Sequence, residues 1–378
     1  MPGPLDGITV LELAAIGPAP FGVMLLADLG AQVIRVDRIA AARGNPGSEA
    51  SMHGLNRGRR SVGVDLKSDQ GTQVVLDLVE RCDVLVEGMR PGVAERLGVG
   101  PEPCFERNPA LIYARMTGWG QEGPLADQAG HDIDYAAISG ALHPIGRADS
   151  PPPPPLNLLS DFAGGGSYLA LGVVAALFER VTSGQGQVID AAMVDGTVNL
   201  TAFVHGLLGL GMWTTERQAN LLDGGSPFYD TYACSDGRYI AVGAIEPQFY
   251  AALLDGLGLD PDEVPQHDHA RQRERFTALF ASRTRDEWAE HFAGTDACVA
   301  PVLSLEEARE HPHNVARGLF TQVEGGGVQP APAPRFSRTP LRADRPVPAY
   351  GAHTDEVLGE LGYAPAHIAS LRASGAVA

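Results

Sequence analysis

The hydrophobic and polar positions of the chain follow two periods over residues 1–116. Short apolar runs, typical of buried strands, recur between polar and glycine-rich breaks at residues 8–13, 32–36, 61–66, 83–87 and 111–116. Helical patterns lie between some of these runs, at residues 21–29 and 68–81, and Ser68 is a candidate N-cap for the second helix. Strands that alternate with helices at this spacing predict an α/β domain with a parallel, Rossmann-like sheet and helices on both faces.

A second pattern begins at five consecutive prolines, Pro151–Pro155, which have to be extended. Two long apolar helices are predicted beyond them, at residues 160–180 and 197–212. After a glycine-rich turn, strand-like runs and a helix indicate a smaller α+β unit, with elements at 228–232, 239–244 and 247–257. The predicted domains are a large domain at 1–200, a linker helix and turn at 201–224, a small domain at 225–319 and a C-terminal segment returning to the large domain at 320–378.

The acidic composition argues against several classes of partner. The net charge of −18 disfavours a nucleic-acid binder and a protein that adheres to anionic membranes. The four cysteines lie far apart and form no CxxC pair, which indicates a reducing compartment. The first ten residues carry no secretory pattern, and the most apolar stretch, residues 163–178, is shorter than the ~20 residues of a membrane span. We therefore expect a cytoplasmic protein without a nucleic-acid or membrane partner.

The first strand–turn–helix unit lacks the signature of a dinucleotide site. Its turn, residues 15–20, has no GxGxxG pattern, and two prolines remove backbone N–H groups that would hold a pyrophosphate. The closely spaced histidines, at 267 and 269 and at 311 and 313, fall in predicted loops and form no convincing ligand set. We expect neither a redox cofactor nor a metal.

A basic cluster stands out in this acidic chain. Six arginines lie at positions 35, 38, 43, 57, 59 and 60, against Asp37 and Glu49, and the only lysine, Lys67, follows them. Arginines at this density either form a structural ion-pair network or bind a compact polyanion, because guanidinium groups hold phosphate bidentately. The sequence leaves both interpretations open.

Three side chains are suited to proton transfer. His131 stands behind a glycine, Asp161 lies near the start of a predicted helix, and Glu246 ends a predicted strand. Each also has a structural explanation: the histidine could be structural, Asp161 could be a helix N-cap, and Glu246 could belong to an acidic first helical turn.

Motifs spread over almost the whole chain give these residues a context. They are GP and PF within 17–21, ADLGA at 27–31, RVDR at 35–38, DLK at 65–67, LIYAR at 111–115, GHD at 130–132, PLNLL at 155–159, DFAGGG at 161–166, GQGQVID at 184–190, GAIEPQFY at 243–250 and TDACV at 295–299. In this order and spacing the sequence resembles the α-methylacyl-CoA racemases, members of the family III CoA-transferase superfamily. Several motifs, DFAGGG among them, occur in looser form in the transferases of that superfamily.

The resemblance implies a cofactor-independent inversion at the α-carbon of a 2-methylacyl-CoA thioester, with CoA entering only as part of the substrate. His131 and Asp161 match the two bases of the family, Glu246 matches the glutamate that pairs with the histidine, and Asn157 matches a supporting asparagine. The implied CoA contacts are Arg38, Val64, Asp65, Leu66, Lys67, Arg90, Arg96, Gly130, Asp132 and Tyr135. The resemblance further implies the family III CoA-transferase fold and an interlocked homodimer. The active site would then lie at the subunit interface, and Glu246 would come from the partner subunit.

The implied chemistry needs an enolate oxygen to be stabilised, because an α-proton beside a thioester is a weak acid. Preorganised donors supply roughly 3–4 kcal/mol each, and we expect the backbone N–H groups at the start of the Asp161 helix to serve. The helix dipole favours the carboxylate form of Asp161 and burial favours its acid form, and the sequence does not decide between them. Two other functions remain open: a family III CoA-transferase with Asp161 as nucleophile, and a non-catalytic acyl-CoA carrier or sensor.

Overall fold

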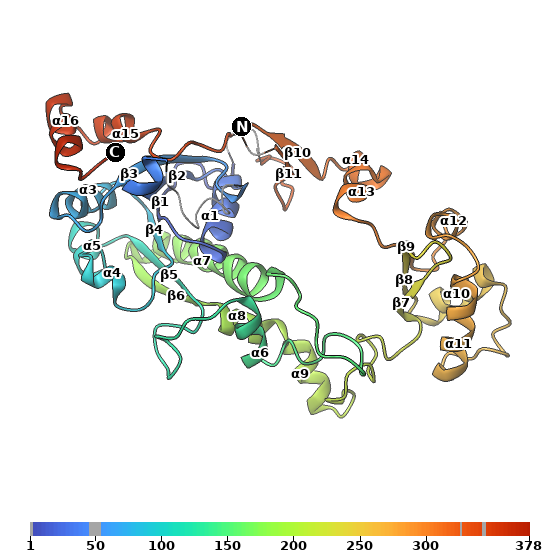
Figure 1. Cartoon of the computed structure of the whole chain (residues 1–378). Coiled ribbons are helices and arrows are strands. Elements are labelled where there is room, and N and C mark those ends of the chain that lie inside the picture. The colour runs from blue at the N-terminus through green and yellow to red at the C-terminus, as the bar shows by residue number, and fades with distance from the viewer. Residues whose placement is uncertain (1–2, 45–53, 326, 342–344) are drawn as a thin grey trace. The chain divides into compact units, whose positions relative to one another are not determined.

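The computed structural model describes residues 3–44, 54–325, 327–341 and 345–378. The chain divides into two compact units, which are described separately here (Figure 1). The first unit comprises Met1–Ser139, Pro155–Leu200 and His313–Ala378, and the second comprises Gly140–Pro154 and Thr201–Pro312.

A six-stranded parallel sheet forms the centre of the first unit, and its strand order is β3-β2-β1-β4-β5-β6. The strands are β1 (Thr9–Leu13), β2 (Gln32–Arg38), β3 (Arg59–Val64), β4 (Val84–Glu87), β5 (Ile112–Thr117) and β6 (Gln187–Ala192). The predicted α/β class and parallel sheet are confirmed. The strand order reverses direction between β1 and β4, and ligands of open α/β sheets bind outside the carboxyl ends of the strands at such a point.

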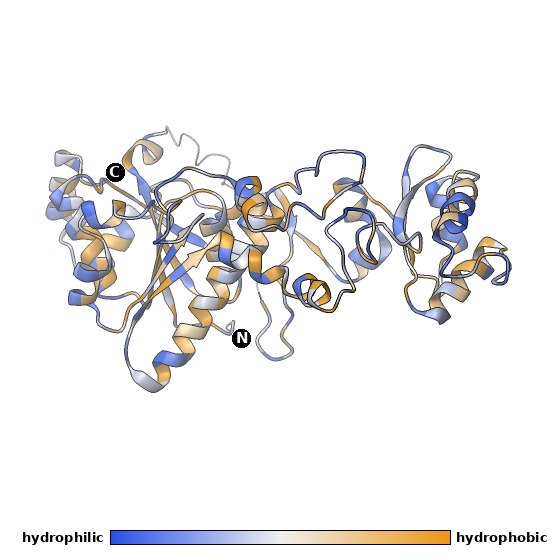
Figure 2. Cartoon of the chain, turned by 90° about the horizontal axis from the view of Figure 1, so that it is seen from below, coloured by the Kyte–Doolittle hydropathy of each residue, from blue (hydrophilic) through white to orange (hydrophobic). Residues whose placement is uncertain are grey.

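Each face of this sheet has its own hydrophobic core, because helices cover the strands on both faces. Figure 2 shows apolar stretches, coloured orange, in the strands and in the helices beside them. One face is covered by α3 (Asp69–Val79), α4 (Val93–Arg96), α5 (Pro101–Arg107), α15 (Thr354–Glu360) and α16 (Pro365–Ser374). The other face is covered mainly by α1 (Pro18–Asp28) and α7 (Ser167–Ser183). Helix α3 begins as predicted, since the hydroxyl of Ser68 accepts the N–H of Gly71 at 3.0 Å.

The C-terminal segment returns to the large sheet and covers its β3 edge. The N–H of Ala378 donates to the carbonyl of Gly63 at 3.0 Å, and the N–H of Asp65 donates to the carbonyl of Ala376 at 2.9 Å. These bonds satisfy backbone groups that an edge strand would otherwise leave open. They also fix the turn after β3, where several of the predicted CoA contacts lie.

The two long helices predicted from the apolar pattern have different structures. The first begins as a π-helix, η2 (Leu158–Gly166), and continues as α7. The second is two helices, α8 (Met193–Leu200) and α9 (Ala202–Gly209), which belong to different units. Helix α8 is fixed by the close approach of Gly196 to η2, whereas α9 has no buried residue. The apolar pattern predicts one helix here, and the difference in packing explains why the structure has two.

The stretch Leu158–Ser183 is one continuous helical run of 26 residues and is long and apolar enough to cross a membrane by length and composition alone. This run is longer than the apolar stretch at residues 163–178 that the sequence predicts, because the π-helical residues of η2 extend α7. One side of α7, with Leu169, Val173 and Leu177, packs in the core beside the sheet. A core helix has the same composition, so this run is weak evidence for a membrane span.

The second unit is built on the antiparallel sheet β7 (Tyr229–Ala233), β8 (Tyr239–Gly243) and β9 (Val299–Pro301). Three helices, α10 (Pro247–Leu257), α11 (His269–Phe280) and α12 (Arg285–His291), supply the rest of its core. Residues 140–154 join this unit because Arg147 forms an ion pair with Asp230 at 2.8 Å and Arg217 donates to the carbonyl of Ser150 at 2.9 Å.

The remaining elements are short. They are α2 (Ile39–Ala42), α6 (Asp132–Ile138), α13 (Leu305–Glu310), α14 (Pro312–Ala316), β10 (Phe320–Val323) and β11 (Gly327–Pro330). Strands β10 and β11 form an antiparallel pair.

Candidate active site

Four of the six clustered arginines are structural. Arg59 and Arg35 both contact the buried carboxylate of Glu12, at 2.6 Å and 3.2 Å. Arg57 pairs with Asp28 at 2.6 Å, and Arg60 pairs with Glu360 at 2.7 Å. A buried charge is costly unless it is paired, so Arg35, Arg57 and Arg59 are committed to the fold.

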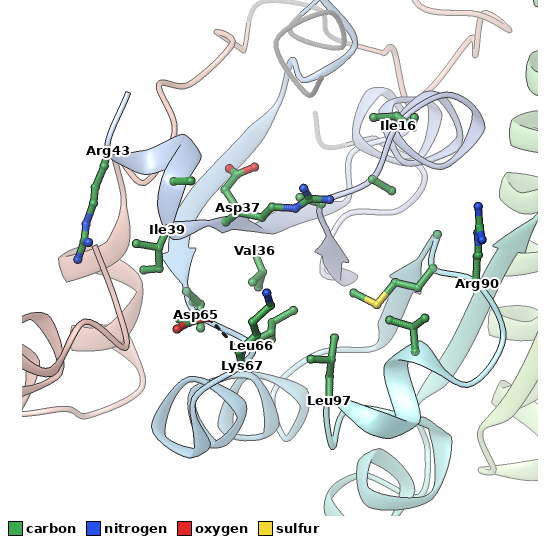
Figure 3. A pocket seen from close by; sticks show the side chains of 18 residues that line it. Ile16, Val36, Asp37, Ile39, Arg43, Asp65, Leu66, Lys67, Arg90 and Leu97 are labelled. Carbon is green, nitrogen blue, oxygen red and sulfur yellow. Dashed lines mark hydrogen bonds between the residues drawn. The ribbon is translucent and has the colours of Figure 1, made fainter. Parts of the chain in front are cut away.

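Arg38 and Arg43 instead line a cavity of about 750 Å³ at the carboxyl ends of β1–β4. The predicted contacts that also line it are Val64, Asp65, Leu66, Lys67 and Arg90. In Figure 3 Lys67 and Leu97 project into the space between the strand ends, with Arg43 and Arg90 on opposite sides. The cavity thus combines four cationic side chains with an apolar lining, which suits a ligand that has both phosphate groups and an apolar part.

A second cavity, of about 490 Å³, adjoins the first, since Ile16, Gly88, Met89 and Arg90 line both. The predicted residues that line the second cavity are Gly130, His131, Tyr135, Asn157 and Asp161, together with Arg90. His131 and Asp161 come from separate segments of the chain, and the structure brings them to one cavity. A single extended ligand can therefore occupy the first cavity and present its other end to both side chains.

Two predicted contacts line neither cavity. Arg96 is exposed at the end of α4. Asp132 is buried, and its Oδ2 accepts the N–H groups of Ser160 and Asp161, each at 2.7 Å. These are the N–H groups that we expected to stabilise an enolate oxygen, so that expectation is wrong: a side chain from another helix already occupies them.

The turn that carries Asp161 is fixed by close glycine packing. At Gly166 an added Cβ would lie 2.6 Å from the carbonyl oxygen of Pro18, and at Gly164 it would lie 2.5 Å from the hydroxyl of Thr197. At Gly196 it would lie 1.8 Å from the carbonyl oxygen of Gly164. Only glycine permits this approach between η2, α1 and α8. Asp161 is the fourth residue of η2, after Asn157 at the N-cap position, so the interpretation of Asp161 as an N-cap is wrong.

Burial and, after it, the negative charge of Asp132 raise the pKa of Asp161 to about 6. The side chain of Asn157, whose Nδ2 approaches Oδ2 of Asp161 at 3.5 Å, and the nearby His131 act in the opposite direction. Burial therefore outweighs any preference of the helix start for the carboxylate form. Asp161 can gain and lose a proton close to neutral pH.

His131 immediately precedes α6 and has an exposed side chain at the second cavity. Its backbone N–H donates to Oδ2 of Asp134 at 2.9 Å, which orders the entry to the helix. Tyr135 follows on the same helix, and its ring packs edge-on against Trp119 with centroids 4.7 Å apart. An added Cβ at Gly118 would lie 2.3 Å from that ring, so a glycine is required for Tyr135 to line the cavity.

Glu246 lies in the second unit, directly before α10, and is exposed. Its side chain does not cap that helix. The described residues contain no group of three or more histidine, cysteine, aspartate or glutamate side chains that could hold a metal.

Several residues that line the second cavity were not predicted from the sequence. Met89, Met116 and Met193 line the second cavity, and Met116 and Met193 also belong to the hydrophobic core on one face of the sheet. Gly17 also lines this cavity, with a φ of 71° that favours glycine, and a Cβ there would lie 3.3 Å from Oδ2 of Asp161. The Gly-Pro turn was the available signal for Gly17, whereas nothing in the sequence distinguished these methionines from core residues.

A Rossmann-like sheet with two joined cavities at its switch point and a histidine–aspartate pair agrees with one known family. The model of CoA-transferase family III matches residues 5–354, and the chain belongs to this family. The chain is 48% identical to the alpha-methylacyl-CoA racemase of Homo sapiens over 372 residues, which are 97% of this chain and 96% of that protein. The racemase of Mus musculus matches with the same identity and coverage.

More distant relatives agree with this assignment. The succinyl-CoA:glutarate CoA-transferase of Homo sapiens is 30% identical, covering 99% of this chain and 90% of that protein. The crystal structure of a CaiB/BaiF family protein from Brucella suis superposes with a TM-score of 0.81 at 28% identity, covering 96% of this chain and 100% of that chain. The family membership and the fold inferred from the sequence motifs are confirmed.

Proposed function

We propose that the protein is an isomerase that interconverts (2R)- and (2S)-2-methylacyl-CoA thioesters by 1,1-proton transfer through an enolate. The observation that carries the proposal is that two proton-transfer groups, His131 and Asp161, line one cavity beside a cation-rich one. The 48% identity to alpha-methylacyl-CoA racemases supports it. A transferase would need only the aspartate, as a nucleophile, and would leave the second base without a role.

In this mechanism the CoA part binds in the first cavity, where Arg38, Arg43, Lys67 and Arg90 provide positive charge. The acyl part lies in the second cavity, whose methionines present a deformable apolar lining. The reaction requires no other cofactor, because both groups that move protons are side chains of this protein.

Asp161 and His131 then act on opposite faces of the α-carbon. In one direction the carboxylate of Asp161 removes the proton and the protonated imidazole returns one to the other face; in the reverse direction the roles exchange. The raised pKa of Asp161 supports this exchange, since the carboxyl group has to hold the proton in half of the cycle.

We further propose that the active protein is a homodimer in which Glu246 of the partner subunit pairs with His131. Helix α7 supports this, because its outward side carries the apolar residues Leu171, Val174, Phe178 and Val181 at helical spacing. Phe178 and Val181 are 80% and 84% exposed, which is unusual for large apolar side chains on one helix face. A second copy of the chain covers this stripe in the proposed dimer. The cytoplasmic location expected from the composition stays a prediction.

The test is incubation with a 2-methylacyl-CoA in D₂O without an acceptor acid. A racemase incorporates deuterium at the α-carbon of either isomer, whereas a CoA-transferase incorporates none and an acyl-CoA carrier gives no turnover. The variants His131→Ala and Asp161→Ala should both lose racemisation. Wild-type activity in both variants would show that the two-base assignment is wrong.

A further inference from the structure

The turn that carries Asp161 is held by a side chain from a different element. At the start of a helix the first N–H groups have no acceptor within the helix, and in η2 these include the N–H groups of Ser160 and Asp161. Both donate to the single oxygen Oδ2 of Asp132, which lies in the first turn of α6 and is 5% exposed. One buried carboxylate therefore ties the segment of His131 to the segment of Asp161.

We propose that Asp132 is a positioning residue of the proton-transfer site. Its carboxylate fixes the backbone of the Asp161 turn and places a negative charge beside the Asp161 side chain. This inference rests on the proposed racemase function and assigns to Asp132 a role in the proton chemistry in place of the CoA contact that the family resemblance implied.

The charges around Asp161 support an effect on its proton. After burial, the charge of Asp132 is the largest influence that raises the pKa of Asp161, and Asp132 is the one carboxylate among the described residues to do so. The other groups near this carboxyl are His131, which immediately precedes α6 and lowers its pKa, and Tyr135 on α6, whose own pKa is raised to about 12 and which stays neutral. Arg90 lines the same cavity from the segment after β4.

The geometry separates the two effects of Asp132 by mutation. Asp132→Asn keeps a carbonyl oxygen that can accept both N–H groups but removes the charge, whereas Asp132→Ala removes the acceptor as well. Asp134→Asn is the matched control, because Asp134 lies on the same helix, accepts a backbone N–H at 2.9 Å and does not influence the pKa of Asp161.

The experiment measures kcat/KM for racemisation against pH in the wild type and the three variants. In the wild type the acid limb is expected near pH 6, with about a tenfold loss at pH 5. In Asp132→Asn the limb should move to lower pH, so that the loss at pH 5 is smaller than in the wild type, while burial still holds the limb above the ordinary aspartate value. Asp132→Ala should lose kcat much more than it changes KM, and Asp134→Asn should keep the wild-type limb.

A second readout does not depend on activity. The ¹³C chemical shift of the Asp161 carboxyl group, identified by its loss in Asp161→Asn, should titrate at lower pH in Asp132→Asn than in the wild type. A titration and an acid limb that do not move in Asp132→Asn would overturn the positioning role, even if the wild type racemises its substrate. Failure of the wild type to exchange the α-proton would instead refute the proposed function, and the titration would still test Asp132.

Discussion

The pH dependence of racemisation tests the two-base mechanism most directly. The pair His131 and Asp161 is active only when it holds one proton, on the imidazole for one direction and on the carboxyl group for the other. Both active forms carry the same number of protons, so they rise and fall together with pH. We therefore expect the two isomers of a substrate to give the same pH profile of kcat/KM.

The position of the acid limb follows from the environment of Asp161. Because burial and Asp132 raise its pKa to about 6, Asp161 is mostly protonated below that pH and can no longer remove the α-proton. The expected kcat/KM at pH 5 is about tenfold below its maximum, whereas an aspartate with a pKa of 3.8 would retain about nine-tenths of it. At pH 7 the same shift raises the protonated fraction of Asp161 from roughly one in 1,600 to roughly one in ten.

The assay follows loss of α-deuterium from each labelled isomer between pH 4.5 and 9 at constant ionic strength, with tryptophan fluorescence as the control for folding. An acid limb near pH 4, or limbs at different pH for the two isomers, would refute the reasoning. The first result would show that Asp161 titrates as an exposed carboxyl group, and the second that the two directions do not share one proton.

Three further predictions concern binding, packing and assembly. Lys67→Ala should raise KM for an acyl-CoA about tenfold, which corresponds to ~1.4 kcal/mol, and leave kcat unchanged, because the first cavity only binds substrate. The control is Arg372→Ala, which breaks an exposed ion pair and should leave steady-state kinetics unchanged. Gly166→Ala should lower the free energy of unfolding, measured with denaturant, by about 1–3 kcal/mol, because the added Cβ would lie 2.6 Å from a backbone oxygen of α1. The control is Gly359→Ala, which has open space around the added Cβ and should not destabilise the protein. Phe178→Asp should give a folded monomer with little activity by analytical ultracentrifugation and assay, and a dimer that persists would contradict the proposed interface.

Local signals predicted much of the secondary structure because they are read within a few residues. The helix predicted at 247–257 is observed with the same bounds, since Pro247 starts it and Gly258, at a φ of 66°, ends it. Most strands of the large sheet were recognisable because both faces are buried and the strands are rich in apolar residues. Strand β6 was missed because it lies at an edge and alternates poorly, with four of its six residues not buried.

The arginine cluster shows where sequence information ends. The ion-pair interpretation is correct for four of its members, whereas binding of a polyanion by the other two stays a prediction. Only the folded chain shows which arginines meet Glu12 and Asp28 and which face a cavity. Whether an arginine forms a buried ion pair or faces the cavity depends on partners that lie at least 21 residues away in the sequence, and no local pattern encodes those contacts.

The sequence by itself determined most of the strands and helices of the large sheet, the family and the residue types available for proton transfer, because these depend on local periodicity and on motifs. The tertiary structure decided which of those side chains share a cavity and what proton affinity Asp161 has. The physical reason is that burial, the charge of Asp132 and the close glycine contacts of the π-helix all arise from elements that are distant in the chain. A pKa depends on what surrounds the group in space, and that surrounding exists only after folding.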